Sequence, residues 1–175
     1  DLVLDDEGHT ADRLRTGEVV AAVTADPGPV PGCRTISLGA LRYAACASPA
    51  FVSRHFSDGV NAAALVAAPV LRFNARDRLQ ARWSADTHGT ETLGFVHWVP
   101  STHAFLDLAV AGLAWGLQPI TLAAPHLTAG RLVELPPGRP LEVDLFWTVS
   151  RLASAALKGL TQGVQAAARQ RLGTR

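Results

Sequence analysis

Ser101 and Thr102 stand where polar side chains could bind a small ligand. They follow an apolar stretch, residues 95–99, that is typical of a buried strand, and they precede residues 104–112, where apolar side chains recur at helical spacing. Ser101 suits a helix N-cap, since its hydroxyl can accept a hydrogen bond from a free amide one turn further on. In α/β proteins, small ligands bind outside the carboxyl ends of strands and near helix N-termini. This turn is therefore a candidate binding position, although helix capping alone accounts equally well for both residues.

Other polar side chains occupy similar positions in the sequence. Asn74 and Asp77 follow an apolar run at residues 69–73 that is typical of a strand. The acidic residues Asp6 and Glu7 follow another such run, at residues 2–4. Thr10 lies near the start of the helix expected next. Carboxylates in a partly dry cleft can bind cations, whereas a carboxylate in the first turn of a helix can instead stabilise the helix dipole. The sequence leaves both roles open for Asp77.

No arrangement typical of catalysis or metal binding is found. The chain contains no GxSxG elbow, no P-loop and no glycine-rich dinucleotide fingerprint. Its six histidines form neither an HExxH motif nor a helical i, i+4 pair. Cys33 and Cys46 lack metal-type spacing, so two reduced thiols are expected, with a disulfide as the alternative. We expect no catalytic residue, no metal and no cofactor.

Size and composition restrict the class of protein. The chain of 175 residues can form one large domain or two small lobes. Its formal net charge of +1 requires no large basic face, so nucleic-acid binding by these residues is not indicated. No apolar run reaches the roughly 18–20 residues that span a membrane, and no signal segment opens the chain. Since the sequence contains no methionine and begins abruptly at a strand-like apolar run, we expect either a fragment of a longer protein or a product trimmed at its beginning.

The order of expected elements is typical of an α/β fold. Residues 95–119 predict a strand, a helix, a glycine-punctuated loop and a strand, which together form a βαβ crossover. Residues 2–23, with a short strand at 2–4, predict a second crossover, so we expect a mostly parallel sheet. Further strands are expected at 33–38, 41–47, 69–73, 131–135 and 141–149, and further helices at 49–55, 62–66, 74–83, 121–127 and 153–172.

Four segments together resemble the effector-binding domain of LysR-type transcriptional regulators. They are DDEGHTADRLRTGEVVAAV at 5–23, LGALRYAACASPAF at 38–51, LRFNARDRLQ at 71–80 and FLDLAVAGLAWGLQP at 105–119. The segment LRFNARDRLQ, together with HWVPSTHAF at 97–105, resembles in particular the subgroup that regulates the export of arginine and lysine. The resemblance extends over nearly the whole chain.

The resemblance implies an α/β fold of two Rossmann-like lobes, similar to type 2 periplasmic binding proteins, with the ligand in the cleft. Residues 1–46 and 129–175 would form lobe I, and residues 47–128 would form lobe II. Relative to the family, the winged helix-turn-helix DNA-binding region and the first strand and helix of lobe I are expected to be absent from these residues.

The resemblance also implies a ligand-sensing role in the cytoplasm. The effector would be a basic amino acid, lysine or arginine, and DNA would be bound only through the missing N-terminal domain. The protein would act as a homodimer or homotetramer, without membrane contact. The alternative is a solute-binding protein or a stand-alone small-molecule binding module of the same fold. The expected ligand-binding residues are Asp6, Glu7, Thr10, Asn74, Asp77, Trp98, Ser101, Thr102 and Gln118.

Each of these residues would bind a different group of the ligand. Ser101 and Thr102, at a helix N-terminus, suit the α-carboxylate of the amino acid. The carboxylates, and Asp77 in particular, suit its cationic groups. Trp98 could stack on the aliphatic stem or guanidinium of the ligand, or could pack in the core. Gln118 would shape the floor of the cleft.

Overall fold

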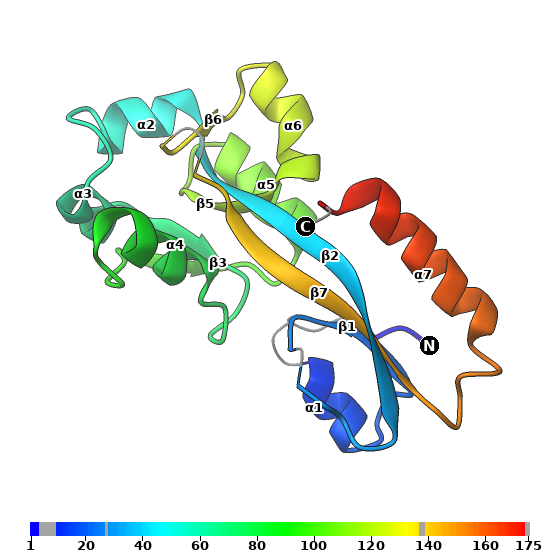
Figure 1. The fold of residues 1–175 in the computed structure, drawn as a ribbon. Helices are drawn as coiled ribbons and strands as arrows, with labels where there is room; N and C mark the ends of the chain where they lie inside the picture. The colour runs from blue at the N-terminus through cyan, green and yellow to red at the C-terminus, as the bar shows by residue number, and fades with distance from the viewer. Residues whose placement is uncertain (4–9, 27, 137–138, 174–175) are drawn as a thin grey trace. The chain divides into compact units, whose positions relative to one another are not determined.

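The computed structural model describes residues 1–3, 10–26, 28–136 and 139–173. The chain forms two compact units, drawn as a ribbon in Figure 1: unit 1 is Asp1–Arg42 with Glu142–Arg175, and unit 2 is Tyr43–Leu141. It passes from unit 1 into unit 2 within strand β2 (Cys33–Ala47) and returns at the start of strand β7 (Leu141–Ser150). This two-part α/β architecture agrees with the expected fold class.

Unit 1 is built on antiparallel strands. Its further elements are helix α1 (Thr10–Arg15), strand β1 (Ala21–Thr24) and helix α7 (Lys158–Arg171). β1 pairs antiparallel with β7, and β7 lies between β1 and β2 in the sheet. Helix α7 lies beside these strands (Figure 1), and the indole N–H of Trp147 on β7 donates to the hydroxyl of Thr161 on α7 at 3.0 Å. This bond ties α7 to the sheet.

The described residues do not form the expected second crossover. Leu2 and Val3 are exposed and belong to no strand, and Leu4 lies outside the described residues. A strand needs a neighbour for its N–H and C=O groups, and no described segment pairs with residues 1–3. β1 instead takes an antiparallel partner, so the prediction of a mostly parallel arrangement is wrong for this unit.

Two element boundaries in unit 1 also differ from the prediction. Residues 33–47 form one continuous strand rather than two, because Gly39 adopts a φ of 109° inside the strand without interrupting it. The last helix begins at Lys158 rather than at residue 153. The segment before it is held in turns, where the Ser154 hydroxyl donates to the carbonyl of Arg151 at 2.8 Å.

A short parallel sheet organises unit 2. Strand β3 (Val70–Arg72) pairs parallel with strand β4 (Val96–Trp98), and the Leu71 N–H on the other side of β3 donates to the carbonyl of Trp115 at 2.8 Å. Trp115 forms a parallel bridge with Val70 and leads into strand β5 (Gly116–Pro119). The crossover predicted for residues 95–119 is therefore confirmed, with β3 as its middle strand.

The rest of the sheet in unit 2 is antiparallel. β5 pairs with the second half of β2, with Gln118 opposite Ala44, and strand β6 (Val133–Glu134) pairs with the last residues of β2. β2 thus runs opposite to β5, and these antiparallel strands form a sheet of their own beside the parallel pair β3 and β4, so the prediction of a mostly parallel sheet is wrong for unit 2 as well.

The helices of unit 2 begin largely as predicted. Ser48 caps the first of them by accepting from the N–H of Phe51 at 3.2 Å, and Asn61 caps the next by accepting from the N–H of Ala64 at 2.9 Å. The fourth helix of the chain is an exception, because it begins five residues after Asn74. The helices are α2 (Pro49–His55), α3 (Ala62–Ala67), α4 (Leu79–His88), α5 (Thr102–Val110) and α6 (Ile120–Thr128).

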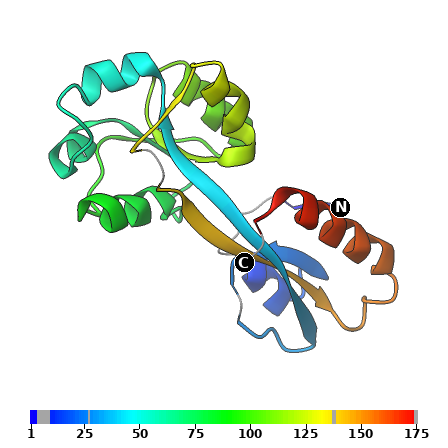
Figure 2. The same ribbon diagram turned by 45° about the horizontal axis from the view of Figure 1, so that its top comes forward.

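These helices cover both faces of the parallel strands (Figure 1, Figure 2). The Trp115 ring packs against Trp83 of α4, with the ring centroids 5.5 Å apart. The next residue, Gly116, faces the opposite way, and a Cβ atom there would lie 2.6 Å from the ring of Phe105 on α5. The core between the strands, α5 and α6 includes Leu71, Phe105, Leu106, Ala109, Ala123 and Leu132. None of the helices in the described ranges has the length and apolar character that crossing a bilayer requires.

Candidate ligand-binding site at the carboxyl edge of unit 2

Three parallel strands of unit 2 end side by side. β3 ends at Arg72, β4 ends at Trp98 and β5 ends at Pro119. Because β4 and the segment from Trp115 both run parallel to β3, their carboxyl ends share one edge of the sheet. We call this the carboxyl edge, and it consists of Arg72, Asn74, Asp77, Trp98, Ser101, Thr102 and Gln118. Six of these seven residues were predicted as ligand-binding.

The start of α5 offers donors at this edge. Ser101 is exposed and caps the helix by accepting from the N–H of Ala104 at 3.4 Å, which is a long hydrogen bond. Thr102 is half-buried and opens the helix, whose first turn contains no acidic residue. The first N–H groups of a helix have no partner within the helix, and its N-terminus attracts negative charge. Capping by Ser101 and binding of an anion are therefore compatible here.

Asp77 serves the local backbone. It is 4% exposed, and its Oδ2 accepts from the N–H of Phe73 at 2.8 Å while its Oδ1 accepts from the N–H of Leu79 at 2.9 Å. The carboxylate thus joins the end of β3 to the start of α4. This geometry corresponds to the helix-supporting role that the sequence left open, and binding of a ligand cation by Asp77 stays a prediction.

Asn74 closes the same turn. Its Oδ1 accepts from the N–H of Arg76 at 2.8 Å and from the N–H of Asp77 at 3.1 Å. An asparagine side chain that bonds two residues ahead mimics a backbone turn and competes with helix formation. This is why α4 begins at Leu79 and not at Asn74, as the sequence had suggested.

Arg72 and Trp98 form a stacked pair at the edge. The Arg72 guanidinium lies over the Trp98 indole, 5.1 Å from the ring centroid, and Trp98 is 52% exposed. Arg72 also donates to the main-chain carbonyl of Asp77, and its buried Nε has no acceptor in the described part of the chain. Trp98 therefore stacks on a guanidinium of the protein itself. Sequence reasoning missed Arg72, although a cation as the penultimate residue of the expected strand at 69–73 was a signal.

Gln118 is a fully buried residue without a partner for its side chain. It is 0% exposed, and within the described residues neither its side-chain oxygen nor its nitrogen forms a hydrogen bond. Leaving a buried polar group unpaired is costly, typically about 1–3 kcal/mol. The sequence indicated Gln118 only as the floor of a cleft.

The other predicted residues belong to unit 1 or lie outside the described residues. Thr10 opens α1, and its hydroxyl donates to the carbonyl of Val23 at 2.7 Å, which ties α1 to β1. Asp6 and Glu7 lie outside the described residues.

Neither a metal site nor a disulfide is found. The described residues hold no group of three or more His, Cys, Asp or Glu side chains that could bind a metal ion. Cys33 and Cys46 are free thiols, as expected. Burial, and secondarily the charge of Glu134, raises the pKa of Cys46 to about 12, so this thiol is an inert core residue.

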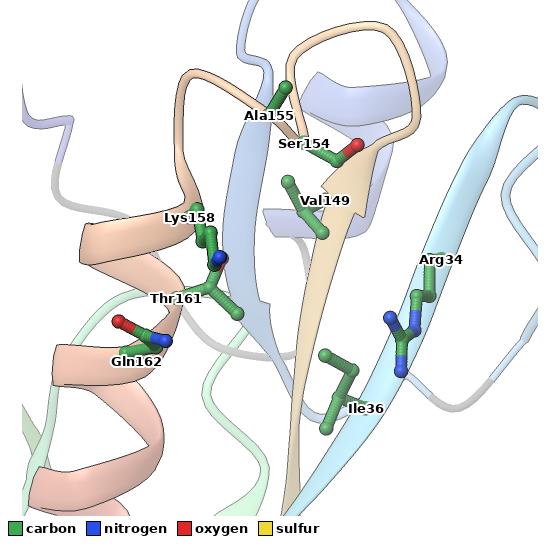
Figure 3. A pocket seen from close by; sticks show the side chains of 8 residues that line it. All are labelled: Arg34, Ile36, Val149, Ser154, Ala155, Lys158, Thr161 and Gln162. Atoms are coloured by element: carbon green, nitrogen blue, oxygen red, sulfur yellow. The ribbon is translucent and has the colours of Figure 1, made fainter.

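Unit 1 contains a depression of its own. It has a volume of about 260 Å³ and lies between α7 and the strands β2 and β7 (Figure 3). Ile36 and Val149 supply apolar surface, and Arg34 and Lys158 are exposed cations among its lining residues. None of the predicted ligand-binding residues lines it.

Comparison with known proteins gives a consistent result. The profile of the LysR substrate binding domain matches residues 1–169. The HTH-type transcriptional regulator ArgP of Pseudomonas aeruginosa is 42% identical over 169 residues, which cover 96% of this chain and 56% of that protein. The chain therefore spans about half the length of this curated relative.

Solved structures agree with this match. The C-terminal domains of a LysR family protein from Agrobacterium tumefaciens are 52% identical, with a TM-score of 0.93 over 98% of this chain and 83% of that chain. Full-length LysG from Corynebacterium glutamicum with bound effector Arg is 38% identical, with a TM-score of 0.85 over 97% of this chain and 58% of that chain.

Proposed function

Because the chain belongs to the family of LysR substrate-binding domains, we propose that it senses a basic amino acid, arginine or lysine, for a transcriptional regulator. The observation that carries the proposal is the similarity to LysG, which was solved with its effector Arg bound, at 38% identity and a TM-score of 0.85. The relative ArgP is likewise named as a transcriptional regulator rather than as an enzyme or a transport protein. This favours the regulator over the solute-binding alternative.

The carboxyl edge supports the proposal with complementary chemistry. The first turn of α5, with Ser101 and Thr102, suits a carboxylate, and the acidic residues predicted for the site, Asp6, Glu7 and Asp77, suit the cationic groups of the ligand. Asn74, Trp98 and Gln118 in unit 2 and Thr10 in unit 1 complete the proposed set.

The proposed regulator acts on DNA through a domain outside these residues. The net charge of +1 is consistent with a sensing domain that makes no DNA contact of its own. We propose that the protein works in the cytoplasm as a homodimer or homotetramer, without a cofactor. The effector then acts by binding more tightly to one arrangement of the regulator than to another.

Calorimetric titration tests the ligand class. The protein is titrated with L-arginine, L-lysine and L-norleucine, which has an apolar side chain of similar length. We expect arginine or lysine to bind at least about tenfold more tightly than norleucine, a difference of about 1.4 kcal/mol. Equal binding of all three amino acids, or no binding of any, would contradict the proposal.

A further inference from the structure

At the carboxyl edge lies a guanidinium that forms no ion pair with any described residue. None of the ion pairs of the described residues involves Arg72, whose partners are the carbonyl of Asp77 and the ring of Trp98. The Asp77 carboxylate is turned instead to the N–H groups of Phe73 and Leu79. A half-buried guanidinium that no carboxylate of the described ranges neutralises favours an anionic ligand.

The start of α5 adds a second positive element beside Arg72. Trp98 is the register partner of Arg72 across β3 and β4, and the N–H of Val99 donates to the Arg72 carbonyl at 2.9 Å. Ser101 follows two residues later and caps the nine-residue helix α5, which has no acidic residue in its first turn. The positive end of the helix and the guanidinium therefore lie on one short stretch of the edge.

Gln118 points to the same place from β5. Side chains alternate along a strand, so Gln118 shares a face with Gly116, on which the Phe105 ring of α5 packs. Gln118 lies two residues nearer the carboxyl edge, a distance of about 7 Å along a strand. Ser101 precedes Phe105 by four residues, about 6 Å along the helix. By this register Gln118 lies on the α5 face of β5, level with the first turn of α5.

We propose that Arg72, Gln118 and the first turn of α5 form a subsite for the α-carboxylate and α-ammonium of the effector amino acid. The carboxylate accepts from the Arg72 guanidinium, from the Gln118 amide nitrogen and from free N–H groups of α5. The ammonium donates to the Gln118 amide oxygen, so a single ligand satisfies both side-chain atoms of Gln118, which have no partner in the described ranges. Trp98 and the Asp77 carbonyl hold the guanidinium in position.

This inference rests on the proposed function. It adds that unit 2 binds the end of the ligand that carries the α-carboxylate and the α-ammonium. It predicts that the α-carboxylate contributes to affinity independently of the distal cation. The protein is titrated with L-arginine, with agmatine, which lacks the carboxylate, and with L-argininamide, in which a neutral amide replaces it. Agmatine and argininamide should bind about 10- to 100-fold more weakly than arginine.

The outcomes separate the two proposals. If neither arginine nor lysine binds, the proposed function fails and the subsite fails with it. If arginine binds and agmatine binds equally well, the proposed function stands and the carboxylate subsite is wrong.

Substitution of Gln118 gives a sharper test. Gln118→Leu replaces an unpaired buried amide by an apolar side chain of similar size, so its melting temperature should equal or exceed that of the wild type. Its affinity for arginine should nevertheless fall about tenfold or more, while its affinity for agmatine, which keeps the ammonium but lacks the carboxylate, should fall less. Gln162→Leu, an exposed position on α7, is the matched control and should leave both affinities unchanged.

Arg72→Lys tests the guanidinium separately, because it keeps the charge but loses the planar fork and the stacking on Trp98. It should weaken arginine binding more than agmatine binding. Wild-type affinity for arginine in Gln118→Leu and Arg72→Lys, or an equal loss of arginine and agmatine in either variant, would overturn the subsite.

Discussion

The Asp77 carboxylate holds the turn between β3 and α4 together. Both of its oxygens accept from main-chain N–H groups, at 2.8 and 2.9 Å, and the side chain is almost fully buried. Donors of this kind stabilise a carboxylate that has lost most of its water. The main-chain carbonyl of Asp77 accepts a hydrogen bond from the Arg72 side chain. Asp77 therefore also helps to position the edge at which we propose ligand binding.

Asp77→Ala should lower the free energy of unfolding by about 2–4 kcal/mol, because two partly buried N–H groups lose a charged acceptor. Urea unfolding followed by circular dichroism measures this change. Asp86→Ala is the matched control, since Asp86 is exposed on α4, and it should change the stability by no more than about 0.5 kcal/mol. Equal effects of the two substitutions would show that the carboxylate does not support the turn.

His88 gives unit 2 a predictable dependence on pH. Its buried Nε2 has no partner among the described residues, and its ring packs edge-on against Trp83 at 5.5 Å. Burial, and secondarily the charge of Arg139, lowers the pKa of His88 below its ordinary value of 6.5. As pH falls through that value, the unfolded chain takes up a proton at His88 before the folded chain does, so the folded state loses stability.

His88→Phe should remove this part of the acid sensitivity, because phenylalanine keeps a ring against Trp83 and cannot be protonated. Thermal melting at about pH 7.5 and about pH 5.5 compares the two proteins across the range in which histidine titrates. The wild type should lose more in melting temperature over this interval than the variant. An identical loss of melting temperature in both proteins would show that the lowered pKa of His88 does not contribute to the acid sensitivity.

At the residue scale, local signals were predicted well and tertiary ones were not. Ser101 caps its helix as expected, and Ser48 and Asn61 cap the helices that were expected directly after them, because a cap depends only on the few residues that follow it. The stacking of Arg72 and the unpaired amide of Gln118 depend on neighbours that are distant in the sequence, and no spacing indicates them.

At the element scale, the crossover from β4 through α5 to β5 determines the geometry of the proposed site. Its apolar periodicity was strong enough to predict it from residues 95–119. Other boundaries were wrong where a side chain competes with the backbone, as Asn74 does before α4, or where a glycine does not end a strand, as at Gly39. The pairing of β5 with β2 was also not predictable, since the direction of a distant partner strand leaves no local pattern.

Gly116→Ala should destabilise the contact between β5 and α5. The new Cβ would lie 2.6 Å from one atom of the Phe105 ring and 3.2 Å from the Cβ of Leu71, so the core must shift. Overpacking of this kind costs about 1–3 kcal/mol. Chemical unfolding measures the loss.

Gly163→Ala in α7 is the control with the opposite expected sign. Nothing lies within 4 Å of a Cβ atom at this position, and alanine favours a helix over glycine by about 1 kcal/mol. Stabilisation by both substitutions, or destabilisation by both, would contradict the assigned packing of Gly116.

At the scale of the whole molecule, the two units are joined by continuous strands. The chain passes between them within β2 and at the start of β7, not through a separate linker. The two-part α/β fold was expected from the resemblance to the LysR family, and the family match extends over residues 1–169. Composition alone allowed either one large domain or two lobes. The prediction of two lobes therefore came from the motifs that resemble the family and not from length or charge.

An amide-resolved NMR titration with L-arginine tests the proposed sensing site most directly. In ¹H–¹⁵N correlation spectra, the backbone signals of residues 72–77 and 101–104 and the side-chain amide of Gln118 should shift with saturable dependence on arginine. The signals of Arg34 and Lys158 at the depression in unit 1 should stay in place. Shifts confined to Arg34 and Lys158, or spectra that arginine leaves unchanged, would contradict binding of a basic amino acid at the carboxyl edge.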